Sequence, residues 1–231
     1  MKEKLDDIYF AQFGEYYEWS YCPETGMWYE DAKEILPEPP GELEKESDFS
    51  CITVVGQDYE QEVMDHNYDV IIAFLNYLED KDDFSDCIGF QLFLRSEKYS
   101  LVGDFSNRLV YRLSEFISDI KTKDYANCYE NEYSNYKFFV WKKPDRQVRF
   151  SIYCYNECDY DGRYLKLIFD ILVDEAVLIS KLESIITTFK ETVYDAIQSY
   201  NKYMGNDFRI RRSDYVFENL FPEYVEIEDP D

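Results

Sequence analysis

Three carboxylates alternate within residues 155–164, YNECDYDGRY, and a glycine follows them. They match the first, third, fifth and sixth positions of a calcium-binding EF-hand loop: Glu157, Asp159, Asp161 and Gly162. The twelfth position, where such a loop needs a bidentate Glu, is Ile168. Apolar residues on both sides alternate with period two, which indicates strands, whereas helices flank a calcium loop. We therefore interpret this stretch as the tip of a β-hairpin.

Other patterns for catalysis or metal binding are weak. His66 is the only histidine, and no GxSxG nucleophile turn accompanies it. Cys154 and Cys158 have no second pair at zinc-ligand spacing, and the 8 glycines form no phosphate-binding motif. We predict no catalytic residues, no metal site and no cofactor.

Magnesium held by carboxylates is the remaining catalytic alternative, because an acid-x-Lys triplet can support a nuclease-like enzyme. Three such triplets occur, Asp31-Ala32-Lys33, Glu79-Asp80-Lys81 and Asp119-Ile120-Lys121. With 49 acidic residues, chance triplets are expected, and none of the three lies in a predicted strand.

The elements that would position these residues follow from apolar periodicity. It predicts an α+β fold with mainly antiparallel sheets built from hairpins and packed by three amphipathic helices. The helices are expected at about 60–80, 107–121 and 174–203, the last with Asp174 as N-cap and Gly205 near its end. The expected strands are 51–56, 88–95, 99–103, 136–142, 146–155 and 163–173.

The last two helices share one apolar spacing, and each follows a predicted hairpin. Either the chain contains a duplicated hairpin-helix unit or two amphipathic helices have converged on one pattern. An aromatic hairpin is predicted before these elements, from YYEWSYC (16–22) and MWY (27–29). The proline-rich, acidic stretch after it predicts two parts, an N-terminal hairpin with its linker (1–48) and a main α+β domain (49–231).

Charge is the strongest compositional signal. Asp and Glu number 49 against 24 Lys and Arg, a formal net charge of −25, and residues 1–86 hold 24 acidic and 5 basic side chains. Such a surface repels phosphates and attracts basic proteins. We expect a basic partner, a nuclease or another enzyme that acts on nucleic acid, and no direct contact with nucleic acid.

The six cysteines form no CxxC pair, the first residues lack the pattern of a signal peptide, and no apolar run approaches the roughly 20 residues that span a bilayer. We therefore expect reduced thiols, a cytoplasmic location and no membrane contact.

A competing interpretation concerns the face of the C-terminal sheet that lies opposite its core. Basic and aromatic residues alternate there and could stack single-stranded bases: Arg149, Tyr153, Tyr155, Tyr164 and Lys166. The overall negative charge opposes this interpretation.

These observations favour a non-catalytic acidic protein that inhibits or neutralises its partner. Two forms fit, a phage or mobile-element antagonist of a defence enzyme and a bacterial toxin immunity protein. The alternatives are the magnesium-dependent enzyme and an acidic structural subunit of a larger complex. The predicted partner-binding surface is the polar face of the 60–80 helix with the following loop, and its residues are Glu62, Asp65, Asp69, Glu79, Asp80, Asp82 and Asp83, flanked by Tyr68 and Tyr77.

Overall fold

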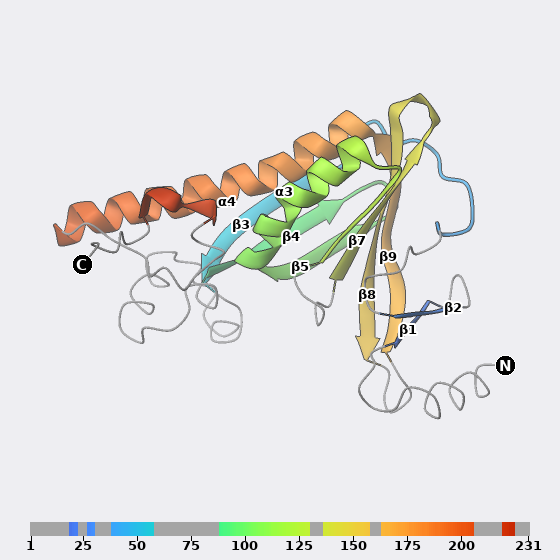
Figure 1. The fold of residues 1–231 in the computed structure, drawn as a ribbon, viewed down its shortest axis with the longest axis horizontal. Coiled ribbons are helices and arrows are strands. Elements are labelled where there is room, and N and C mark those ends of the chain that lie inside the picture. Colours follow the sequence, from blue (N-terminus) through green and yellow to red (C-terminus); the bar gives the residue numbers. More distant parts are fainter. Residues whose placement is uncertain are drawn as a thin grey trace, which may run out of the picture.

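The computed structural model describes residues 19–22, 27–30, 38–57, 88–129, 136–157, 163–205 and 219–224. In this part of the chain the fold is α+β, with two sheets and two long helices (Figure 1). The strands are β1 (Trp19–Cys22), β2 (Met27–Glu30), β3 (Ser50–Gln57), β4 (Ile88–Arg95), β5 (Ser100–Ser106), β6 (Tyr125–Cys128), β7 (Tyr136–Lys143), β8 (Gln147–Glu157) and β9 (Arg163–Asp174). The helices are α3 (Asn107–Thr122) and α4 (Glu175–Met204).

One sheet has six strands in the order β2-β1-β9-β8-β7-β6, and the other has three in the order β3-β4-β5. Neighbouring strands are antiparallel except for β1 and β9, which are parallel where Tyr21 pairs with Tyr164. Hairpins dominate because short turns join strands that are adjacent in the sequence.

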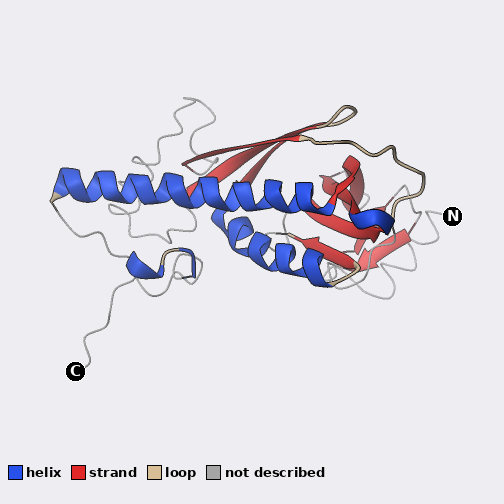
Figure 2. Ribbon diagram, turned by 90° about the horizontal axis from the view of Figure 1, so that it is seen from above, coloured by secondary structure: helices blue, strands red, loops and turns tan. Residues whose placement is uncertain are grey.

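The two helices cover one side of the sheets, and α4 runs along most of the molecule beside α3 (Figure 2). The predicted stripe of α3 is buried: Leu109, Leu113, Phe116, Ile117 and Ile120. On α4 the buried members of the matching stripe are Leu178, Leu182, Ile185 and Phe189, and Ile186 packs beside them. Both helices therefore enclose one apolar core against the inner faces of the sheets.

Strand and helix boundaries follow local signals closely. β5 passes directly into α3, and β9 passes directly into α4. Asp174 occupies the N-cap position of α4, but its side chain makes no capping hydrogen bond and pairs with Lys45 instead. α4 ends as expected at Gly205, whose φ of 66° is left-handed and whose backbone N–H donates to the Asn201 carbonyl.

Each helix thus follows a three-stranded antiparallel arrangement, β3-β4-β5 before α3 and β7-β8-β9 before α4. An internal duplication would produce this shared order of three strands followed by a helix. Strand β6, between the two units, was not anticipated from the sequence.

Two parts of the predicted fold class are not confirmed. The backbones of β1 and β2 pair, but the side chains that would make this hairpin aromatic are not described. The third helix, at 60–80, lies outside the described residues. The proposed division after residue 48 stays a prediction.

Candidate functional site

A buried polar group lies on the face of the six-stranded sheet opposite the helices. Arg149 and Ser151 come from β8, and Asp170 lies directly across from Ser151 on β9. Alternate residues of a strand point to the same face, so the three side chains meet there. All three are buried, although they are polar or charged.

Asp170 accepts three hydrogen bonds within this group. Arg149 Nε donates to Asp170 Oδ1 at 2.9 Å, and Arg149 Nη2 donates to Oδ2 at 2.5 Å. Ser151 Oγ donates to Oδ1 at 2.7 Å. The planar guanidinium matches both carboxylate oxygens, which gives the pair a fixed geometry as well as a strong interaction.

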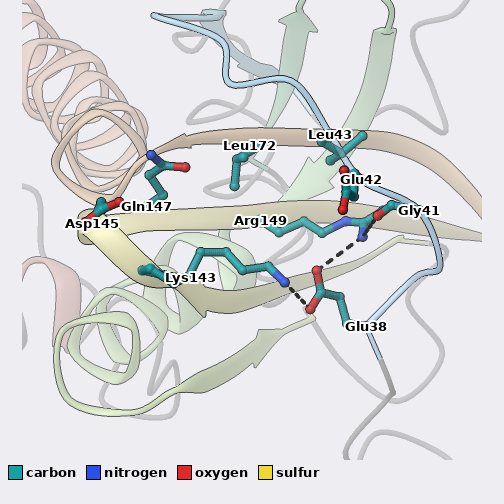
Figure 3. Close-up of a pocket in the computed structure, with 10 residues that line it drawn as sticks. Glu38, Gly41, Glu42, Leu43, Lys143, Asp145, Gln147, Arg149 and Leu172 are labelled. Carbon is teal, nitrogen blue, oxygen red and sulfur yellow. Dashed lines mark hydrogen bonds and ion pairs between the residues drawn. The ribbon is translucent and has the colours of Figure 1, made fainter.

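A segment more than a hundred residues earlier in the chain closes the site. We call residues 38–46 the strap. Arg149 Nη1 donates to the carbonyl of Gly41 at 3.1 Å and to Oε1 of Glu38 at 3.2 Å (Figure 3). It also donates to a third strap acceptor, the carbonyl of Pro39, at 2.6 Å. Gly41 has a φ of 100°, which glycine adopts without strain.

The strap makes further contacts with the sheet. Lys143 forms an ion pair with Glu38, and the backbone N–H of Glu46 donates to the Leu172 carbonyl at 2.8 Å. Lys45 Nζ lies 2.7 Å from a carboxylate oxygen of Asp174. The strap is thus held at both ends against β8 and β9.

Arg149 remains charged in this setting. Burial opposes its charge, but hydrogen bonds and the negative charge of Asp170, followed by those of Glu38, outweigh burial and raise the pKa of Arg149. All three guanidinium nitrogens are engaged with protein acceptors. This residue therefore acts as a clasp that fastens the strap to the sheet.

A pocket of about 320 Å³ opens beside the clasp (Figure 3). Its lining residues are Glu38, Gly41, Glu42, Leu43, Lys143, Pro144, Asp145, Gln147, Arg149 and Leu172. The two cations beside it, Lys143 and Arg149, are already paired with Glu38 and Asp170. The exposed carboxylates of Glu42 and Asp145 lie at the rim of the pocket. Such a pocket suits a cationic or hydrogen-bond-donating group.

The turn beside this pocket has unusual backbone geometry. Asp145 and Arg146 both have positive φ, 59° and 57°, and the N–H of Gln147 donates to the Pro144 carbonyl. Asp tolerates this region, whereas Arg adopts it rarely. The turn carries some strain and holds Asp145 at the rim.

The predicted partner-binding residues are not placed by the structure. All nine lie within 58–87, outside the described residues, and so does His66. The surface therefore stays a prediction.

The residues on either side of the calcium-like loop are placed. Glu157 pairs with Arg163, so β8 and β9 form the predicted hairpin, although residues 158–162 themselves lie outside the described part. Ranges 38–57, 88–129, 136–157 and 163–205 contain no cluster of three His, Cys, Asp or Glu side chains that could hold a metal.

One acid-x-Lys triplet can be judged, and it lies on α3. Asp119 Oδ2 pairs with Lys123 at 2.8 Å, and Lys121 pairs with Glu183 of α4 at 3.2 Å. Both pairs are exposed; the first lies at the end of α3 and the second joins α3 to α4. No third carboxylate approaches among the described residues. The other two triplets lie outside those residues.

The structure corrects the interpretation of the sheet face as an exposed base-stacking platform. Arg149 is 3% exposed, and Tyr153 is 0% exposed. Tyr153 packs with Phe139 and Trp141 in a second apolar cluster. Alternation placed Arg149 and Tyr153 on this face correctly, but it gave no sign that other segments cover the face. The side chains of Tyr155, Tyr164 and Lys166 are not described.

The clasp was missed, although the sequence holds one signal for it. Asp170 interrupts an apolar run, LIFDILV at 167–173, and an acid between buried neighbours needs a partner. The hairpin register places Arg149 and Ser151 beside it. The strap contacts could not be foreseen in this way.

Comparison of the chain with known protein families, curated proteins and solved structures found no match. In the part of the chain that is described, Cys51, Cys128 and Cys154 form no disulfide. None of the helices described there is long and apolar enough to cross a membrane.

Proposed function

We propose that this protein is a non-catalytic acidic binding protein that inhibits or neutralises a basic partner acting on nucleic acid. An antagonist of a defence enzyme and a toxin immunity protein are the two forms of this function. In both, carboxylates take the place of phosphates opposite Lys and Arg of the partner.

The observation that carries the proposal is the uneven distribution of charge along the sequence. Residues 1–86 hold 24 acidic and 5 basic side chains, a net charge of −19. Residues 87–231 hold 25 acidic and 19 basic side chains, a net charge of −6. Most of the excess negative charge is therefore in residues 1–86.

This distribution matters because like charges repel one another and oppose folding, and residues 1–86 have too few Lys and Arg side chains to offset their acids. A concentrated negative charge attracts a basic protein over a distance of about 8–10 Å at physiological salt and speeds association.

The test compares two sets of charge reversals that change net charge equally. The first set is Asp65→Lys, Asp69→Lys, Asp82→Lys and Asp83→Lys. The matched control reverses four exposed acids among the described residues: Glu44, Glu97, Glu191 and Asp195. Both variants change the formal net charge from −25 to −17.

The partner is first identified by affinity purification of the full chain from its native cells, and circular dichroism checks that both variants fold. Association rates are then measured at low and high salt. We expect the first set to slow association at least about tenfold at low salt, with a much smaller effect of the control. Equal effects would place the interface elsewhere, and a partner without basic character would refute the proposal.

A further inference from the structure

The outer face of the three-stranded sheet carries an apolar row. Ile52 of β3 pairs with Phe93 of β4, which pairs with Val102 of β5. Paired residues point to the same face, so the three side chains form a line across the whole sheet. Ile52 is 56% exposed and Val102 is 53% exposed. Phe93 lies half-buried between them.

The opposite face of the same strands already serves the core. Phe90, Leu92 and Leu94 of β4 are buried there, on the side of the sheet that α3 and α4 cover (Figure 1). An antiparallel sheet with one packed face normally exposes polar residues on the other. Single exposed apolar residues are common, but a contiguous row suggests an interaction surface.

The most acidic segment of the chain is attached to this sheet. Gln57, the last residue of β3, pairs with Ile88, the first residue of β4. The intervening residues 58–87 hold 10 acidic side chains and 1 lysine, a net charge of −9. Both ends of this segment are therefore fixed at the same end of the sheet.

We propose that the basic partner docks on this outer face, with the row Ile52-Phe93-Val102 as its apolar anchor. This inference rests on the proposed function and adds the chemistry of the partner. The contacting surface presents apolar side chains flanked by Lys or Arg. The anchor is needed because exposed charges contribute little affinity, whereas buried apolar side chains at an interface contribute most of it.

A model peptide with this chemistry provides the probe, an amphipathic helix of Leu and Lys. A second peptide, in which Ser replaces every Leu, has the same charge without the apolar face. The test variant of the full chain is Ile52→Thr with Val102→Thr, because Thr retains β-branching and favours exposed strands. The control is Tyr194→Gln on α4, which alters another exposed large side chain, 44% exposed and beside Tyr224.

Affinities are measured by fluorescence anisotropy at two salt concentrations. We expect the Leu/Lys peptide to bind the double Thr variant about tenfold more weakly than the unmodified protein, with the same salt dependence. Tyr194→Gln should bind it as the unmodified protein does. The Ser/Lys peptide should bind all three proteins equally, and circular dichroism checks that the double variant is folded.

The possible failures are distinct. Unchanged affinity of the double Thr variant for the Leu/Lys peptide overturns the docking surface and leaves the proposed function standing. Failure of the unmodified protein to bind either basic peptide counts against the proposed function itself. Sedimentation showing a dimer that the double variant dissociates would instead make a second copy of this chain the occupant, and would overturn docking of a basic partner there.

Discussion

The clasp gives the sharpest prediction about stability, through Arg149→Met. Methionine keeps an unbranched apolar side chain but removes the guanidinium. Asp170, whose side chain is 3% exposed, would then keep only the hydrogen bond from Ser151. The carbonyls of Pro39 and Gly41 would also lose their donor.

Removing one partner of a buried ion pair costs about 3–5 kcal/mol, because the other charge is left in an environment that solvates it poorly. We therefore expect Arg149→Met to lower the free energy of unfolding by about 3–5 kcal/mol. Urea denaturation followed by circular dichroism measures this quantity.

The matched control is Arg112→Met on α3. Arg112 pairs with Glu115 at 3.3 Å, and both side chains are well exposed, so its loss should cost at most about 1 kcal/mol. The double variant Arg149→Met with Asp170→Leu should be more stable than Arg149→Met alone, because it leaves no buried charge unpaired. Equal destabilisation by Arg149→Met and Arg112→Met would refute the clasp.

Three smaller effects can also be measured. The pKa of Asp48 lies below its ordinary 3.8, first because Lys181 donates a hydrogen bond to it and second because the backbone N–H of Phe49 does. The stability that this lowered pKa provides is present above pH 3.8 and is lost as the pH falls through the folded-state pKa. Lys181→Met should raise the pKa of Asp48 in an NMR titration, and an unchanged pKa would contradict this. Burial raises the pKa of Cys51 to about 12, so only about one thiol in ten thousand is ionised at pH 8. Iodoacetamide should therefore label Cys51 far more slowly in the folded protein than in urea, and equal rates would show that the thiol is accessible. Arg146→Gly should raise the free energy of unfolding by about 1 kcal/mol, because glycine relieves the positive φ, and lower stability in urea denaturation would show that Arg146 is not strained.

Local patterns in the sequence were sufficient to predict most of the described helices and strands. The α3 stripe from Leu109 to Ile120 repeats over about three turns, and the bounds of β4 are those that its alternation predicted. Gly205 ends α4 because glycine adopts a left-handed φ without strain. These signals depend on residues that are near one another in the chain, so they can be recognised from the sequence without the tertiary structure. Strand β6 has only four residues, too few for a clear period.

The sequence by itself also determined the net charge of −25 and where the acids lie along the chain. It could not determine which polar residues become buried. Alternation placed Arg149 on the outer face of its sheet, and exposure was the natural expectation for that face. Only the tertiary structure brings Glu38 and Gly41 onto it, 111 and 108 residues away. Burial depends on which distant segments cover a face, and a local period carries no information about them.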